Sequence, residues 1–187
     1  MHKASILLAA FALAAGCGSE PTTPESTADL KVQHATPAEH QGLAAARAAT
    51  ARFHRFDVAH KAGYDFLFMD MCMVDQSGHN LGGMGYHYVN TDLLDDKVDV
   101  NSPEAVLYEP GKNGQLRLVG LEYVIPAAAW TSPEPPELLG QQLKLNAFGL
   151  WALHVWIWKR NPSGIYADWN PDVNCDNAGA VRAGGRH

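Results

Sequence analysis

The alternation of hydrophobic and polar positions predicts a helix first and strands after it. The run from Ala38 to Ala62 is rich in helix-forming residues and keeps an apolar side. Thr36 suits the N-cap and Pro37 the first helical position, while Gly63 is typical of a helix end. We therefore expect one long N-terminal helix over 38–62.

The remainder of the chain has the pattern of β-strands. Strands are expected over 64–74, 84–90, 105–108, 115–125 and 148–158, with a hairpin turn at 109–114 and a short helix or turn at 138–145. One helix followed by antiparallel strands indicates an α+β fold, in which the helix packs on one face of a curved antiparallel sheet. A single domain over 38–175 accounts for this pattern.

The first residues read as an export signal. Met1–Lys3 is positively charged, and the apolar run Ala4–Ala15 is shorter than the roughly 20 residues that span a bilayer as a helix. Residues 1–16 therefore predict a signal peptide. Small residues directly before Cys17 resemble the lipobox of bacterial lipoproteins, and this resemblance implies that Cys17 carries lipid. The alternative is an ordinary exported protein that is cleaved near the same place.

The segments that flank the domain look unstructured. Residues 17–37 are rich in Ser, Thr, Pro and Glu and predict a flexible tether behind the lipid anchor. Residues 176–187 are expected to form a frayed tail. The protein would then sit outside the cytoplasm as a membrane-anchored lipoprotein, on the periplasmic side or at the cell surface.

Composition narrows the classes of function. The chain of 187 residues is 47% hydrophobic, which is enough to fill a core and excludes disorder as its main state. Its formal charge of -6 and the lack of a basic stripe argue against a nucleic-acid partner. The expected partners are the membrane, through the N-terminal lipid, and a metal or small ligand.

Two cysteines remain after Cys17. An exported chain occupies a compartment that permits disulfides, so we predict a bond between Cys72 and Cys175. In the chain-entropy model, closing a loop of about a hundred residues stabilises the fold by roughly 4–5 kcal/mol. The competing interpretation, a pair of metal-binding or redox thiols, lacks a C-x-x-C spacing.

Three predicted strands each carry one ligand-capable side chain among apolar neighbours: His87, Glu122 and His154. A buried carboxylate without a partner costs several kcal/mol or shifts its pKa upward, so Glu122 should be paired, metal-bound or open to a cavity. Imidazoles and a carboxylate held by neighbouring strands suit Zn, Cu, Fe or Mn. The sequence therefore predicts a shared His87/Glu122/His154 pocket, with His79 in a glycine-rich loop as a possible fourth ligand.

Three functions follow from this pocket. In the first, it binds a transition metal or a small ligand. In the second, the protein is a metal-dependent hydrolase or oxidoreductase in which Glu122 acts as general base. In the third, the protein is a structural or interaction lipoprotein and the three side chains are merely satisfied inside its core. The methionines of the 69–73 run could also bind copper as soft ligands, although such residues more often fill a core.

Four motifs resemble those of a group of exported bacterial proteins and lipoproteins that have no established activity. They are GMGYHYVN at 83–90, LVGLEY at 118–123, LHVWIW at 153–158 and NPDVNC at 170–175. The resemblance covers roughly residues 45–175. It implies the outline of the domain and adds no functional residue to those above.

Overall fold

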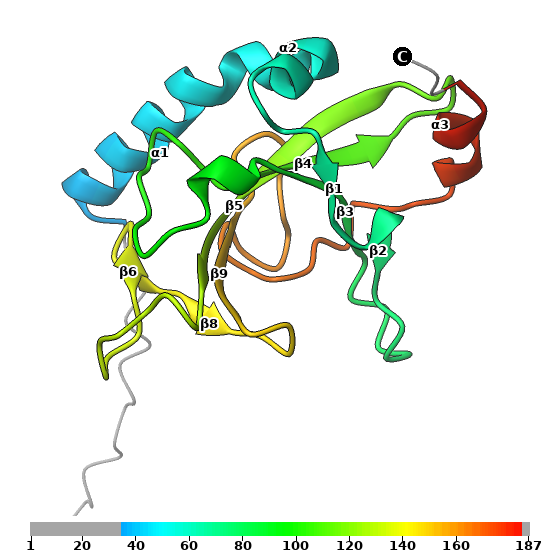
Figure 1. The fold of residues 1–187 in the computed structure, drawn as a ribbon. Helices are drawn as coiled ribbons and strands as arrows, with labels where there is room; N and C mark the ends of the chain where they lie inside the picture. Colours follow the sequence, from blue (N-terminus) through cyan, green and yellow to red (C-terminus); the bar gives the residue numbers. More distant parts are fainter. Residues whose placement is uncertain (1–34, 185–187) are drawn as a thin grey trace, which may run out of the picture. The chain divides into compact units, whose positions relative to one another are not determined.

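The computed structural model describes residues 35–184. The predicted signal peptide, Cys17 and nearly all of the predicted tether therefore lie outside the described residues. Within the described part, a helical N-terminal segment packs on an antiparallel sheet of seven strands (Figure 1). The predicted α+β class is confirmed.

The N-terminal helix begins where the sequence predicts. Helix α1 spans Pro37–Thr50 and opens with a capping box. The Glu39 N–H donates to Thr36 Oγ1 at 3.1 Å, and the Thr36 N–H donates to the Glu39 carboxylate at 3.3 Å. These two bonds satisfy backbone donors that an uncapped helix leaves open.

The helix does not run unbroken to residue 62. It continues as a 3-10 turn, η1 (Ala51–His54), then breaks at Arg55 and resumes as α2 (Phe56–Lys61). The Phe53 carbonyl, which an unbroken α-helix would use internally, accepts a hydrogen bond of 2.6 Å from the Tyr108 hydroxyl. This bond from the sheet accounts for the break, and it is not visible in the local sequence.

All pairings in the main sheet are antiparallel, and its strands lie in the order β1-β3-β4-β5-β9-β8, with β2 also paired to β3. The strands are β1 Phe66–Leu67, β2 Met73–Val74, β3 Gly83–Val89, β4 Ala105–Pro110, β5 Leu116–Pro126, β8 Lys144–Leu145 and β9 Leu150–Val155. The predicted strands at 84–90, 105–108, 115–125 and 148–158 are therefore present, and the predicted 109–114 hairpin joins β4 to β5.

Two predicted segments differ from the structure. Residues 64–74 form no continuous strand, because Met69 and Asp70 adopt φ values of 58° and 51°, which bend the chain into the 3-10 turn η2 (Phe68–Asp70) between β1 and β2. Residues 138–145, expected as a helix or turn, contribute to short strands instead. Here β6 (Glu137–Leu138) pairs with β7 (Gln141–Gln142), and β8 joins the main sheet.

The two faces of the sheet have different coverings. On one face, the helical segment and the sheet share the main core, to which Phe53, Tyr86, Tyr108 and Leu121 belong. In Figure 1, α1 and α2 lie across this side of the sheet. His87, Glu122 and His154 belong to the other face, where they line a pocket.

The chain after β9 returns along β3. Gly83 and Asn170 exchange backbone hydrogen bonds of 3.0 and 3.1 Å, and the Trp156 indole N–H donates to the Ala167 carbonyl at 2.6 Å. Cys72 and Cys175 form a disulfide with a Cα–Cα distance of 5.8 Å. The structure thus contains the predicted bond, which ties the segment after β9 to the chain just before β2.

The predicted frayed tail at 176–187 is partly helical. Part of the range 176–187 forms the short helix α3 (Ala178–Gly184). Ala178 and Val181 pack against the main core, and the Ala178 carbonyl accepts a hydrogen bond of 3.4 Å from Tyr86. This apolar contact explains why the chain remains helical beyond the disulfide.

Candidate metal centre

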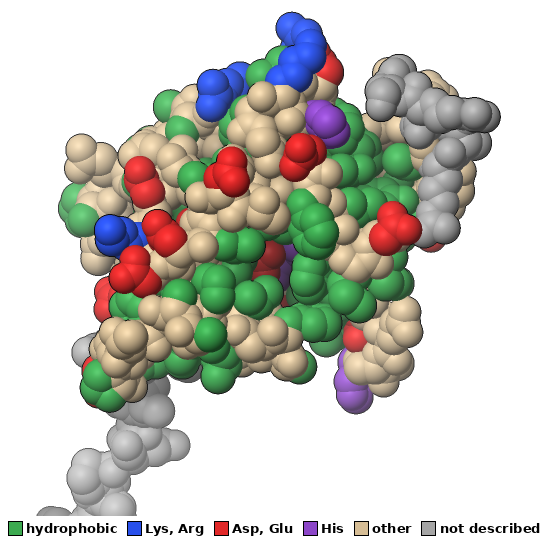
Figure 2. All heavy atoms as spheres, in the orientation of Figure 1, with side chains coloured by type: hydrophobic (Ala, Val, Ile, Leu, Met, Phe, Trp, Pro, Cys, Tyr) green, Lys and Arg blue, Asp and Glu red, His purple; other side chains and the backbone are tan. Residues whose placement is uncertain are grey.

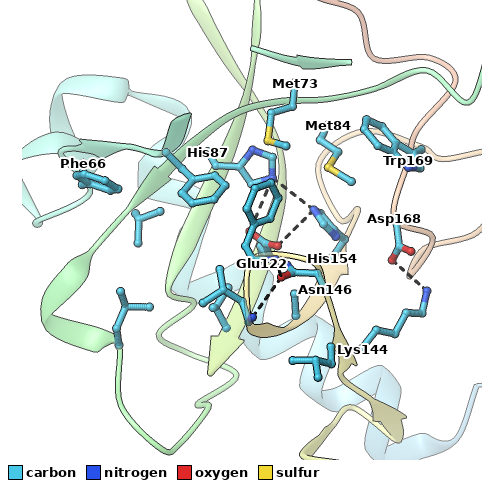
Figure 3. A pocket seen from close by; sticks show the side chains of 18 residues that line it. Phe66, Met73, Met84, His87, Glu122, Lys144, Asn146, His154, Asp168 and Trp169 are labelled. Atoms are coloured by element: carbon cyan, nitrogen blue, oxygen red, sulfur yellow. Dashed lines mark hydrogen bonds and ion pairs between the residues drawn. The ribbon is translucent and has the colours of Figure 1, made fainter. Parts of the chain in front are cut away.

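Three central strands of the sheet position the three candidate ligands. His87 lies on β3, Glu122 on β5 and His154 on β9. Glu122 and His154 are direct cross-strand partners, whereas β4 separates His87 from both. On β4, Ala105 lies opposite Glu122. Leu107 on β4 lies opposite His87, and the imidazole of His87 lies beside the Glu122 carboxylate (Figure 3).

The ligand atoms of the three residues meet in a small triangle. His87 Nε2 lies 3.4 Å from His154 Nε2 and 3.7 Å from Glu122 Oε2, and His154 Nε2 lies 3.6 Å from Glu122 Oε1. A tetrahedral ion with bonds of about 2.0–2.1 Å separates its ligand atoms by about 3.3 Å. The triangle is therefore close to the size that an ion at its centre would require, and these residues could hold a metal.

Hydrogen bonds within the protein do not account for this cluster. Within the triangle, only the contact between the two imidazoles, at 3.4 Å, falls within hydrogen-bond distance. Among the described residues, none donates a hydrogen bond to the Glu122 carboxylate, and His87 Nδ1 makes no hydrogen bond of ordinary geometry. Since buried polar groups nearly always have partners, a carboxylate that lies between two imidazoles and has no internal donor has the chemistry of a ligand-binding site.

Burial shifts all three groups toward their neutral forms. Burial, together with the nearby His154, lowers the pKa of His87 to about 3. Burial and the charge of Lys144 lower the pKa of His154 to about 4. Burial, reinforced by Asp168, raises the pKa of Glu122 to about 8. Near pH 7 both imidazoles are thus in the form that binds metals, while binding through Glu122 requires the loss of one proton.

A cavity of about 480 Å³ opens in front of the triangle. Most of its lining is apolar, and the space-filling view in Figure 2 shows a hollow with acidic and histidine atoms at its floor and hydrophobic atoms around it. Met73 and Met84 lie beside the imidazoles in Figure 3. Lys144 and Asp168 form an ion pair of 3.0 Å on another side of the cavity. An ion at the triangle would therefore face a space that a second molecule can enter.

Sequence reasoning missed most of the cavity wall. Lys144, Asn146, Asp168 and Trp169 come from a two-residue strand and from loops, where the local pattern is that of an ordinary surface. No periodic signal distinguishes them from other polar loop residues. Only the return of the C-terminal segment along β3 brings Asp168 and Trp169 to the site.

Other candidates from the sequence lie elsewhere. His79 is exposed in the loop between β2 and β3, and the structure does not bring it to the triangle. Met69 and Met71 are exposed, while Met73 lines the cavity. The core packing considered for these methionines therefore does not describe Met69 and Met71.

Two further buried acids, Glu104 and Glu109, lie outside the predicted site. Glu109 accepts hydrogen bonds from Lys159 at 2.8 Å, Arg117 at 3.0 Å and the Asn174 N–H at 3.2 Å. Glu104 accepts one of 2.7 Å from the Val124 N–H, and burial raises its pKa to about 8. Both carboxylates accept hydrogen bonds from within the protein, whereas Glu122 accepts none from the described residues.

Among residues 35–184, no helix combines the length and the apolar character needed to cross a bilayer. Comparison with family models, curated proteins and solved structures gives no match for this chain. Its function is therefore argued from the geometry of the site.

Proposed function

We propose that this protein is an exported metal-binding protein in which His87, Glu122 and His154 hold one divalent transition metal ion. The observation that carries the proposal is the buried triangle of ligand atoms, 3.4–3.7 Å apart, in which the Glu122 carboxylate receives no hydrogen bond from the described residues. Two imidazoles and one carboxylate occur in catalytic zinc sites and in non-haem Fe(II) sites, and the same donors accept Cu and Mn.

The proposal includes export and lipid attachment. The disulfide supports a location outside the cytoplasm, because such bonds form in oxidising compartments. We place the signal peptide at 1–16 and the lipid on Cys17, in keeping with the motif resemblance to exported bacterial proteins. Metabolic labelling with a radioactive fatty acid tests this part. The wild-type chain should take up label and fractionate with membranes, whereas Cys17→Ser should take up none.

Metal analysis of protein purified without a tag tests the site. We expect about one ion per chain in the wild type after incubation with Zn, Fe(II), Cu or Mn and removal of excess metal. His154→Ala and the nearly isosteric Glu122→Gln should both lose it. His79→Ala is the matched control, because it removes an exposed imidazole outside the triangle. Equal metal content in the wild type and both triangle variants, with the variants folded, would refute the site.

A second candidate function is a metal-dependent enzyme, as a hydrolase or an oxidoreductase. The observation that favours it is the cavity in front of the triangle, since catalytic metal sites keep one position open to substrate. In this function His87, Glu122 and His154 would hold the ion, which would supply Lewis-acid chemistry toward a substrate oxygen. The two Glu122 oxygens lie 3.6 and 3.7 Å from the two imidazoles, which suits a metal ligand better than a free general base. Turnover of a hydrolytic and oxidative substrate panel that Glu122→Gln abolishes would support it.

A further inference from the structure

We infer that the cavity binds a neutral, mainly apolar organic molecule with an aromatic ring and one oxygen or nitrogen donor. Only the placement of the donor at the triangle rests on the proposed metal site, since the apolar walls exist without the ion. The ligand would occupy the cavity in front of the triangle, next to the proposed metal ion.

The walls provide the first argument. Twelve of the eighteen residues that line the cavity are apolar. The aromatic side chains Phe66, Phe68, Phe148 and Trp169 are among them, and the rings of Phe68 and Phe148 meet edge to face at 5.2 Å. This contact joins two segments far apart in the sequence at one wall of the cavity. Aromatic walls favour a planar ring, which can make the same edge-to-face contacts.

The mouth provides the second argument. Phe66, Leu145 and Phe148 line the cavity and are each slightly more than half exposed. A soluble surface rarely keeps several large apolar side chains together in water unless they contact a ligand or a partner. A small molecule explains both the mouth and the hollow behind it, because a volume of about 480 Å³ lies within the range of ligand pockets.

Charge provides the third argument. Lys144 and Asp168, the charged residues of the wall outside the triangle, pair with one another at 3.0 Å. Their charges offset one another, so the wall outside the triangle has no net charge and favours a neutral molecule. Asn146 and the triangle supply the remaining polar groups of the lining, and at the triangle a phenol, carbonyl or amine could coordinate an ion or bond to an imidazole.

The test uses N-phenyl-1-naphthylamine, a neutral aromatic dye, in fluorescence titrations of the purified protein with and without bound metal. We expect saturable binding in the wild type. Leu150→Trp, which fills the cavity, and Phe148→Ser, which opens its wall, should each weaken binding about tenfold or more. Leu81→Ser is the matched control, since Leu81 is an exposed apolar residue outside the lining, and it should bind as the wild type does.

The donor is tested with 1-naphthol against naphthalene. On metal-loaded protein we expect 1-naphthol to bind about tenfold more tightly or better, and this preference should vanish in Glu122→Gln. If the protein takes up no metal under any loading condition but binds the dye, and Leu150→Trp removes that binding, the apolar site is supported and the metal site is refuted. Metal binding with no saturable dye binding would refute the apolar site and leave the metal proposal standing.

Two further outcomes would overturn the inference. Equal loss of dye binding in Leu81→Ser and Leu150→Trp would mean that the dye binds the general surface. A dimer in sedimentation that Phe148→Ser dissociates would mean that a second copy covers the mouth.

Discussion

Two buried carboxylates on neighbouring strands, Glu109 on β4 and Glu122 on β5, have opposite surroundings. Glu109 lies against two cationic side chains and a backbone N–H, all within 3.2 Å. Glu122 lies against two imidazoles at 3.6 and 3.7 Å and receives no hydrogen bond from the described residues. The contrast teaches that burial of an acid alone does not indicate function. The absence of internal donors does, because a buried carboxyl group without a partner is costly and a bound ligand can supply the partner.

Removal of the disulfide should have the largest effect and should fall on the Glu109 side. The Cys72–Cys175 bond holds the segment whose Asn174 N–H contacts Glu109. We expect the double variant Cys72→Ser, Cys175→Ser to lose roughly 2–4 kcal/mol in urea unfolding. Metal stoichiometry should stay near that of the wild type, because the triangle lies on the central strands. Loss of metal with the fold intact would contradict this separation.

Metal addition should stabilise the folded protein, and of the two acids only Glu122 should be needed for this gain. At a free metal concentration 100 times Kd, linkage predicts a gain of about 2.7 kcal/mol in the free energy of unfolding. We expect this gain in the wild type and in Glu109→Gln, and none in Glu122→Gln. Thermal or urea unfolding with and without metal measures it. A full gain in Glu122→Gln would exclude the carboxylate as a ligand.

In the metal-free protein, substitution of Glu109 should cost more stability than substitution of Glu122. Glu109→Gln leaves the Lys159 and Arg117 cations without their counter-charge, and it should cost about 1–3 kcal/mol, less than a fully buried pair because Arg117 is largely exposed. Glu122→Gln replaces a neutral acid with a neutral amide, and it should change stability by less than about 1 kcal/mol. Urea unfolding at pH 7 without metal compares them. Equal losses of stability in the two variants would contradict the difference proposed between the two acids.

Glu104 accepts a hydrogen bond from the Val124 N–H, and its contribution to stability should depend on pH. Burial raises its folded pKa to about 8 from an ordinary value of 4.5, so its contribution is fully present below about 4.5 and is lost as pH rises through 8. The wild type should therefore lose stability relative to Glu104→Gln from pH 5 to 8, by at most about 1.4 kcal/mol per pH unit. A difference between the two proteins that stays constant with pH would refute the raised pKa.

The smallest effect should come from His79→Ala. Its imidazole is exposed in the loop before β3 and lies outside the triangle. Stability should change by less than about 0.5 kcal/mol, as for an ordinary surface substitution, and metal content should not change. Unfolding and metal analysis on the same preparation check both. A loss of metal would show that the loop closes onto the site.

Local pattern was sufficient for the central strands. Alternation over 84–90, 115–125 and 148–158 identifies β3, β5 and β9, because each side of a strand meets one environment. The same alternation isolates His87, Glu122 and His154 as polar residues among apolar ones. The capping residues at Thr36 and the Cys72–Cys175 pair were equally accessible, since both depend on few residues.

The features that local pattern did not predict depend on contacts between segments far apart in the sequence. The break before Arg55 depends on the Tyr108 hydroxyl, and the bend at Met69 and Asp70 replaces a strand that alternation alone would continue. The walls of the cavity come from loops with no periodic signal. The sequence determined which polar side chains stand alone among apolar residues on their strands. The pairing order and register of the sheet decided that these side chains meet, because a distance across strands is a property of the fold.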